Sequence, residues 1–533
     1  MKNEYPVQKV KLTAEKEVSH IFNHYGMYVE MSLGNVSDET KNEIKDMLFN
    51  RLHTKVFHSC FMLCHAKYHP EYKNFAPGED HFKAESDEEI DAWITRQWGY
   101  RAYGGFEFAR DIKEHGGAIA LNICGFEDHH LGTEPVERMF ANATKEELEI
   151  MMGNNTDAVM TDIDKPQMAD DYVPVYVDKA IKVVKRMINH FDMPVKYISI
   201  LDEPNVNYIS PQQLCRIIRL AREKLDAAGL EFVEINGPAA AGINLAYAEM
   251  IKKIDPIAFS YIKNITIHGF GSGNMDKEHR ETARQLDRPL WITSTAAPSG
   301  IKFCDLPRDE NGALYDNWAF AGVVNASAVL IDVNLGASYM GMWVAMRDAM
   351  EGGKNRLNVE HQYFMLHTDP HEGHPILGRE LVKYTTFDYI STISATFDDD
   401  AQIYYCESSE EGCMSERFDL TNLVKNQMAA LVGKNQNGKW GICILNKTDS
   451  ETRKKQKSML YENIKTHSLV GPSVTLEVEL DIPALYGSGE RRFAVLATGK
   501  NGMYLQPRED IVLTDGKGTV LVQPFEILSI KER

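Results

Sequence analysis

Two adjacent carboxylates form the segment of this sequence that is best suited to do chemistry. Asp202-Glu203-Pro204-Asn205 follows the apolar run YISIL, so both acids come directly after a predicted buried strand. A carboxyl group that is buried or close to a second negative charge has a raised pKa, which suits it to donate a proton in catalysis. Glu203 is therefore the candidate general acid/base. For such a segment taken alone, an ordinary turn with solvated acids is the alternative.

Further polar and aromatic side chains lie within or just after other predicted strands. They are Glu30, Asn122, His268, Trp291 and Trp343. Sugar rings stack on aromatic side chains through their C–H faces, and sugar hydroxyls need paired hydrogen-bond donors and acceptors. Together with the two acids, these residue types favour a sugar site. We expect all five to contact the sugar, together with Asn205.

The strands that would position these residues recur over roughly the first 390 residues. Eight β-branched or apolar runs alternate with helical patterns: HYGMYVEM, KVFHSCFMLC, AIALNIC, YISILDEP, FVEINGP, NITIHGF, PLWITSTA and ASYMGMWV. Repeated βα units predict a parallel sheet, and eight of them predict a closed (β/α)₈ barrel over residues 21–392. Active sites of such barrels lie at the C-terminal ends of the strands, where the polar residues above are found.

Two of the intervening helices can be read directly from the sequence. Apolar residues recur at helical spacing over 177–188, with Lys and Arg between them. The next helix begins with Ser210 as its N-cap and Pro211 at its first position, with Gln213 completing a capping box, and it ends near Gly229.

After about residue 395 the pattern changes to short alternating strands. Asn-Gly and Asp-Gly turn signals stand at 437–438 and 515–516, and apolar residues recur with period two over 474–480. This pattern predicts an antiparallel β-sandwich over 393–533. We expect residues 1–20 to add a strand to it, because the chain start needs a surface on which to pack.

Composition excludes several classes of partner. The chain has 533 residues, 43% of them hydrophobic, and a formal charge of −19, which disfavours nucleic acids and acidic membranes as ligands. The N-terminal segment has neither a signal-peptide pattern nor a membrane-spanning run, so we expect a cytoplasmic protein. A homo-oligomer stays open.

The eight cysteines are scattered, without the paired spacing of a zinc site or a disulfide framework. The sequence also has no glycine-rich phosphate loop between a strand and a helix. We therefore expect neither a metal nor a cofactor. A lyase or aldolase barrel would need a Schiff-base lysine or a metal cluster at a strand end, and the sequence shows neither.

Several of these motifs resemble clan A of the glycoside hydrolases, the retaining (β/α)₈ glycosidases. YISILDEPN, YISPQQLCRIIR, NGP, ITIHGF and LWIT follow one another much as in family 30. YGMYVEMSLG is more similar to family 51 arabinofuranosidases, in which a strand-one Glu contacts the substrate, and Glu30 matches that position. The clan carries its acid/base Glu after strand four in an Asn-Glu pair and its nucleophilic Glu after strand seven. The resemblance thus implies Glu203 as acid/base on a β-linked glycoside.

Two positions depart from the clan pattern. Asp202 stands where the clan has Asn, and Ser294 in LWITS stands where the nucleophilic Glu is expected. A hydroxyl does not replace that carboxylate, since the two-carboxylate retaining route needs its second carboxyl about 5 Å from the first.

Four explanations of Ser294 remain open. In the first, Ser294 is an engineered substitution that stops turnover in a retaining enzyme. In the second, a 2-acetamido group of the substrate acts as the nucleophile and Asp202 orients that group. Alternatively, the barrel has lost catalysis and binds carbohydrate only. Finally, a loop carboxylate such as Asp305 replaces the missing nucleophile.

Overall fold

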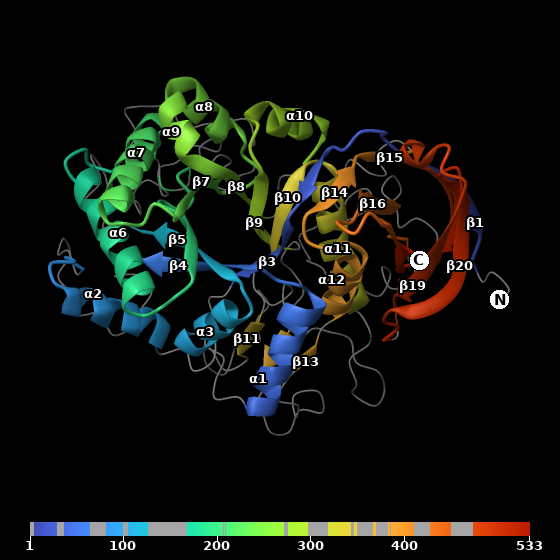
Figure 1. Cartoon of the computed structure of the whole chain (residues 1–533), viewed down its shortest axis with the longest axis horizontal. Helices are drawn as coiled ribbons and strands as arrows, with labels where there is room; N and C mark the ends of the chain where they lie inside the picture. Colours follow the sequence, from blue (N-terminus) through green and yellow to red (C-terminus); the bar gives the residue numbers. More distant parts are fainter. Residues whose placement is uncertain are drawn as a thin grey trace, which may run out of the picture.

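The computed structural model describes most of the chain. The described part comprises residues 5–28, 37–63, 82–99, 105–125, 168–205, 207, 209–270, 275–296, 318–342, 346–348, 366–368, 382–383, 385–409, 427–448, 473–500 and 502–533. Within it, a barrel and a curved sheet lie side by side (Figure 1).

The first of these two parts is a closed barrel of eight parallel strands. In chain order they are β3 (His24–Tyr28), β4 (Val56–Met62), β5 (Ala118–Cys124), β6 (Val195–Ser199), β7 (Glu234–Ala240), β8 (Ile262–Phe270), β9 (Leu290–Ala296) and β10 (Ala337–Met342). Each pairs with the next, and β10 closes the ring onto β3. All eight runs predicted as barrel strands are therefore confirmed, as is the (β/α)₈ fold.

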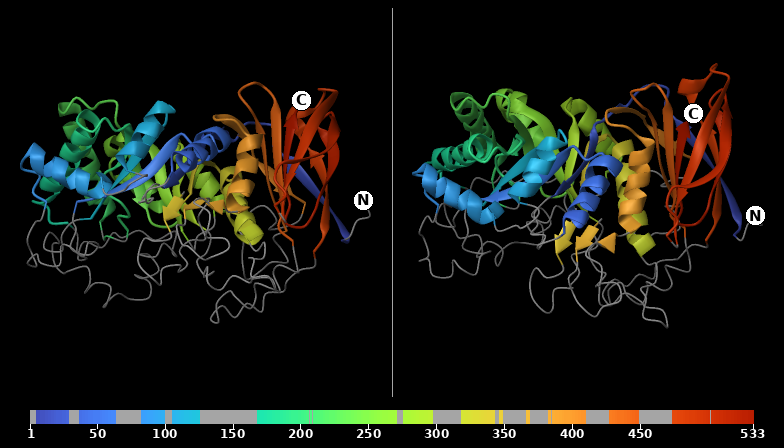
Figure 2. Two further views of the ribbon diagram at one scale, coloured as in Figure 1. Left: turned by 90° about the horizontal axis from the view of Figure 1, so that it is seen from below. Right: turned by 60° about the horizontal axis from the view of Figure 1, so that its bottom comes forward.

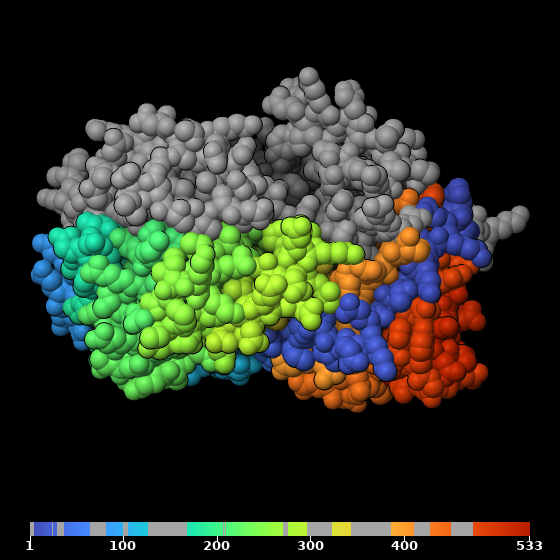
Figure 3. Space-filling view, turned by 90° about the horizontal axis from the view of Figure 1, so that it is seen from above, coloured from blue at the N-terminus to red at the C-terminus, as the bar shows by residue number. Residues whose placement is uncertain are grey.

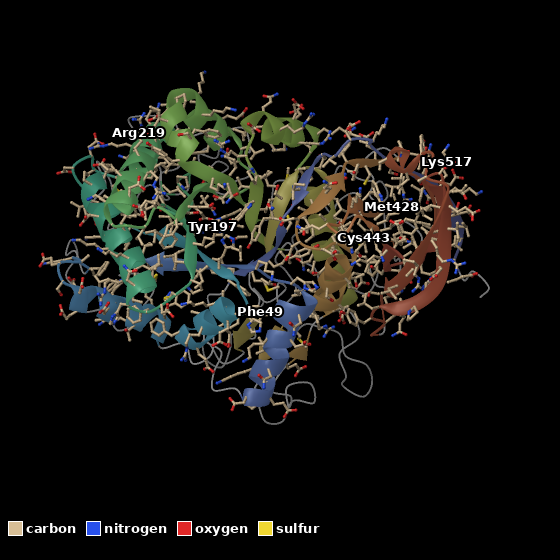
Figure 4. All side chains as sticks on the ribbon, viewed as in Figure 1. Phe49, Tyr197, Arg219, Met428, Cys443 and Lys517 are labelled. Atoms are coloured by element: carbon tan, nitrogen blue, oxygen red, sulfur yellow. The ribbon has the colours of Figure 1, made fainter. Side chains whose placement is uncertain are left out.

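Helices lie around the barrel, and two of them lie between it and the curved sheet. They are α1 (Asp38–Lys45), α2 (Asp87–Ile94), α3 (Phe106–Glu114), α6 (Val173–Asn189), α7 (Pro211–Ala227), α8 (Ala246–Ile254), α9 (Pro256–Tyr261), α10 (Lys277–Leu286), α11 (Trp318–Asn334) and α12 (Thr385–Thr396), with π-helical turns at Asp46–Arg51 and Thr95–Gly99. In Figure 4, Tyr197 lies among the barrel strands and Arg219 on the outer helical layer. No helix of the described segments is both long enough and apolar enough to cross a membrane.

The N-terminus of α7 shows how closely local sequence sets a helix boundary. The Ser210 hydroxyl accepts a hydrogen bond from the Gln213 backbone N–H at 3.2 Å, as predicted for an N-cap. The reciprocal half of the predicted capping box is wrong, because the Gln213 side chain instead donates to the Met168 carbonyl at 2.6 Å. That bond ties the helix start to the chain segment before α6.

The C-terminal part is one curved sheet of eleven strands. Their order across the sheet is β15 (Cys406–Ser408), β1 (Val7–Ala14), β18 (Thr475–Asp481), β21 (Lys517–Val522), β20 (Gln506–Thr514), β19 (Glu490–Thr498), β22 (Ile527–Glu532), β17 (Trp440–Asn446), β16 (Met428–Lys434), β14 (Ala401–Tyr404) and β2 (His20–Phe22). A 3-10 turn spans Pro483–Leu485, and a separate small sheet comprises β11 (Met346–Asp348), β12 (Leu366–Thr368) and β13 (Val382–Lys383).

Strand β1 makes the sheet mixed, because it pairs in parallel with β18 and antiparallel with β15. Figure 3 shows blue N-terminal residues against the red C-terminal strands at one end of the molecule. The turn signals at 437–438 and 515–516 connect β16 to β17 and β20 to β21. The period-two run places Leu476, Val478 and Leu480 in the core of the sheet.

The barrel and the sheet share one continuous apolar core. Helices α11 and α12 lie between them (Figure 2), and a single cluster of buried side chains runs from the barrel into Leu431 and Cys443 of the sheet. The α12 hydroxyls bond across this boundary, Thr392 to the Thr498 hydroxyl and Thr396 to the Ser529 hydroxyl, each at 2.7 Å. The sheet therefore acts as a fixed support for one side of the barrel.

The buried His20, between the sheet and the barrel, should make the protein less stable in acid. His20 lies in β2, just before β3, and its ring nitrogens are buried. Burial lowers the pKa of His20 to about 4, and Arg280 acts in the same direction. As the pH falls from about 6.5 to about 4, the unfolded chain takes up a proton that the folded protein excludes, which lowers the free energy of unfolding by about 3 kcal/mol.

Urea unfolding at pH 7 and pH 4.5 tests this contribution. We expect His20→Asn to lose less stability than the unchanged protein between the two pH values. His53→Asn is the matched control, since His53 is exposed and its φ of 52° suits asparagine. If both variants lose the same amount of unfolding free energy between the two pH values, His20 is not the group that causes the acid destabilisation.

Candidate active site

Asp202 and Glu203 stand just beyond the C-terminal end of β6, the fourth strand of the barrel. The backbone N–H of Asp202 donates to the Ile123 carbonyl at 2.9 Å, and that of Glu203 donates to the Ala239 carbonyl at 3.0 Å. The segment is thus tied to β5 on one side and to β7 on the other. Glu203 has a φ of 47°, in the left-handed region, which is a strained conformation of the kind found at functional sites.

An irregularity in β7 supplies the acceptor that holds Glu203. The pairing of β7 with β8 shifts between Pro238 and Ala240, and Ala239 has a φ of 57°. The Ala239 N–H donates to the buried Thr266 hydroxyl of β8 at 3.0 Å. Because a bulge re-aims the backbone locally, the Ala239 carbonyl can point at Glu203 instead of extending the ladder. Thr266 thereby positions Glu203 through β7.

His268 of β8 joins the two acids. Its Nδ1 lies 2.8 Å from Glu203 Oε1, and its Nε2 lies 3.5 Å from Asp202 Oδ1. Burial lowers the pKa of His268, but the negative charges of Asp202 and Glu203 outweigh that effect, so the net shift of the pKa is upward. The His268 side chain is 4% exposed and that of Glu203 is 30% exposed. Glu203 therefore reaches the barrel mouth while its hydrogen-bond partner stays buried.

Asp202 has partners on two further strands. Its Oδ1 accepts a hydrogen bond from the Asn122 side chain of β5 at 2.8 Å. Its Oδ2 faces two thiols, Cys124 Sγ at 3.5 Å and Cys60 Sγ at 4.0 Å. Of the predicted site residues, the structure thus brings Asp202, Glu203, Asn122 and His268 together.

Ser294 of β9 is the register partner of His268. Neighbouring parallel strands lie about 4.8 Å apart, and register partners point to the same face of a sheet. The pairing of β8 with β9 shifts by one residue just before this point, so Trp291 and Ser294 share the inner face although they are an odd number of residues apart. Ser294 therefore stands beside His268, on the strand that follows it around the barrel.

Two residues predicted to contact a sugar make their observed contacts within the protein. Trp291 stacks on Tyr339 with ring centroids 4.6 Å apart and meets Tyr197 edge-on at 4.9 Å, in an apolar layer near the N-terminal ends of the strands. The Asn205 side chain is fully buried, donating to the Ala241 carbonyl and accepting from the Ala241 N–H. Trp291 thus fills the barrel, and Asn205 fastens the Glu203 loop to Ala241, the residue that follows β7.

Three other predicted positions lie outside the described residues. They are Glu30, Trp343 and Asp305. Their proximity to Glu203 stays a prediction.

Sequence reasoning missed Cys60, Cys124 and Thr266 as neighbours of the site. All three lie in predicted strands, but the cysteines have no motif spacing and the threonine is an ordinary strand residue. The usable signal is their position toward the C-terminal ends of barrel strands, where inward polar groups collect.

Asn205→Ala tests whether this side chain holds the loop or binds ligand. The change leaves both backbone groups of Ala241 without their partner, at about 1–3 kcal/mol each, so we expect a loss of about 2–6 kcal/mol in the free energy of unfolding. Denaturant titration measures it, with Asn50→Ala as control. Asn50 is exposed and its side chain donates to the Asp46 carboxylate at 3.0 Å, so its loss should stay within about 0.5 kcal/mol. Similar values for the two variants would contradict the structural role of Asn205.

Comparison with solved structures shows that the fold of this chain occurs in known proteins. The sequence matches no family model and no curated protein. Among solved structures, the chain is similar to a family 30, subfamily 8 xylanase from Clostridium acetobutylicum, with TM-score 0.57, 12% identity and coverage of 98% of this chain and 99% of that one.

Two further structures give the same result. A family 30 xylanase C catalytic domain from Talaromyces cellulolyticus has TM-score 0.58 at 11% identity, covering 99% of this chain and 100% of that one. An endo-β1,6-glucanase has TM-score 0.55 at 12% identity, covering 98% and 93%. The chain therefore shares, over nearly its full length, the barrel-plus-sheet fold of these glycoside hydrolases.

Proposed function

We propose that this protein is a glycosidase that acts on a β-linked glycoside, with Glu203 as its general acid/base. The observation that carries the proposal is the Glu203 carboxyl group at the C-terminal end of the fourth barrel strand, bonded at 2.8 Å to the buried His268 and itself open to the mouth. An acid in this position can protonate a leaving oxygen and then accept a proton from water. The shared fold with a xylanase and a β-glucanase supports the same reaction class.

The residues around Glu203 have different roles in this proposal. Asn122 and His268 hold the two acids, since each has a direct contact with Asp202 and His268 also contacts Glu203. Ser294 marks the position from which a carboxylate nucleophile acts in a retaining site, next to His268. In our proposal the unmodified chain uses a 2-acetamido group of the substrate with Asp202 orienting it, or is an inactivated form of a two-carboxylate enzyme.

Glu203→Gln should abolish the acid/base step while leaving the fold intact. On an aryl β-glycoside with a poor leaving group, we expect kcat/KM to fall by about 10²–10⁴-fold. On a dinitrophenyl glycoside the fall in the first step should be much smaller, because that leaving group needs no proton. Glu223→Gln, at an exposed position on α7, is the control and should match the unchanged protein. A Glu203→Gln variant with full activity on both substrates would refute the assignment.

A second pair of variants separates the two routes at Ser294. If the site is a disabled two-carboxylate centre, Ser294→Glu should raise hydrolysis of β-glycosides without a 2-acetamido group by at least about tenfold. It should also form a covalent 2-fluoroglycosyl enzyme that is visible by mass spectrometry. If catalysis is substrate-assisted, the unmodified protein should cleave the 2-acetamido substrate alone and lose that activity in Asp202→Ala.

A third outcome is that neither the unmodified protein nor Ser294→Glu hydrolyses any of the tested glycosides. It would favour the alternative that the barrel binds carbohydrate without cleaving it, by the same inward polar groups. Calorimetric titration with β-linked xylo- and gluco-oligosaccharides distinguishes that role. Binding that is lost in His268→Ala would support the carbohydrate-binding role. Absence of binding would rule out both hydrolysis and binding of these sugars.

A further inference from the structure

Two thiols meet at the floor of the candidate site. Cys60 lies in β4 and Cys124 in β5, both are buried, and their side chains cluster with Tyr28 and the partly buried Met62. Cys60 is the register partner of Asn122, and Met62 that of Cys124, so all of these side chains share the inner face of the barrel. Sulfur atoms are thus concentrated at the C-terminal end of strands two and three.

Both thiols aim at one oxygen of Asp202. Cys124 Sγ is 3.5 Å and Cys60 Sγ is 4.0 Å from Asp202 Oδ2, and one ligand atom from each residue lies within 4.8 Å of the others. The opposite oxygen, Oδ1, is held by the Asn122 amide at 2.8 Å. That bond fixes the carboxylate so that Oδ2 faces the sulfurs, as second-layer partners do in metal sites.

These distances match tetrahedral coordination of zinc. With Zn–S bonds of about 2.3 Å and Zn–O bonds of about 2.1 Å, tetrahedral angles place sulfur and oxygen about 3.6 Å apart and two sulfurs about 3.8 Å apart. The observed sulfur–oxygen distances lie within a few tenths of an ångström of that value. We propose that Cys60, Cys124 and Asp202 form a binding site for a thiophilic divalent cation, Zn²⁺, in the floor of the barrel mouth.

A disulfide between the same cysteines fits the backbone poorly. The two residues are offset by two positions on neighbouring strands, as the pairing of Cys60 with Asn122 shows. A strand spacing of about 4.8 Å combined with a rise of about 6.6 Å separates their Cα atoms by about 8 Å, and disulfides need less than about 7 Å. A bridging cation spans this offset without movement of either strand.

The donor set also defines the chemistry of the site. Each thiol loses its proton on binding, so one Zn²⁺ is taken up and two protons are released, with two thiolates and one carboxylate as ligands. Among the residues that the structure describes, three supply ligands, and a site with three protein ligands leaves its fourth tetrahedral position for a water or a substrate hydroxyl, the arrangement of reactive rather than purely structural zinc sites. This inference requires no step of the glycosidase proposal.

Cobalt titration of the full-length, chelator-treated protein tests the site directly. Co²⁺ bound to two thiolates gives an intense sulfur-to-cobalt charge-transfer absorption, which Zn²⁺ then removes by displacement. We expect saturation at one equivalent and at least a tenfold weaker affinity in Cys60→Ser and in Cys124→Ser. Cys215→Ser is the matched control, because Cys215 is another buried thiol, on α7, whose pKa burial raises to about 11.

The outcomes are separable from those of the activity assays. Absence of the charge-transfer absorption in the unchanged protein, with circular dichroism showing a folded chain, would overturn the site. An equally intense absorption in both serine variants would do the same. Should a serine variant fail to fold, Asp202→Asn provides the second test, because it removes the negative oxygen and should weaken the binding of cobalt. None of these readouts depends on glycoside hydrolysis.

Discussion

Closure of the barrel leaves its strands with no face toward solvent, and the arrangement of the site depends on this constraint. The outer faces pack on helices, and the inner faces fill a column of limited width. Near the N-terminal ends the filling is aromatic, with Trp291, Tyr339 and Tyr197 in one layer. Toward the C-terminal ends it becomes polar, through Asn122, His268 and Ser294. A buried polar group without a partner costs about 1–3 kcal/mol, so these side chains have to bind one another or the loops above them.

The strained backbone at Glu203 persists because the loop is tied at several points. Its N–H is bound by the Ala239 carbonyl, Ala239 is bound by Thr266, and Asn205 bonds both backbone groups of Ala241. A left-handed residue costs of order 1–3 kcal/mol, which such bonds can offset. The Glu203 carboxyl is therefore held by neighbouring strands as well as by its own segment, so its place is fixed before any ligand binds.

Local sequence was sufficient to predict the strands and insufficient to predict which side chains face inward. The barrel runs are buried on both faces, which identifies parallel strands but leaves little of the alternation between apolar and polar residues that would tell the two faces apart. The sequence predicts Trp291 as a sugar contact, whereas its early position in β9 places it in the aromatic layer near the N-terminal ends of the strands.

Contacts between distant segments were also beyond sequence reasoning. The one-residue shift that aligns Ser294 with His268 arises only when β8 and β9 pair. The proximity of Cys60 and Cys124 to Asp202 requires three strands to close into a ring. The prediction of the α7 capping box was half wrong for the same reason, because the Gln213 side chain donates to the Met168 carbonyl, outside its own helix.

The charges at the mouth suggest how the departures at 202 and 294 are connected. In the clan A pattern that the sequence resembles, one carboxylate follows strand four and a second follows strand seven. Here both carboxylates follow strand four, and both contact His268, while strand seven contributes a neutral hydroxyl. His268 thus still faces two negative groups, which is why its pKa is raised despite burial. Asp202 thus supplies the second negative group beside His268, and its Oδ2 faces two sulfurs on strands two and three.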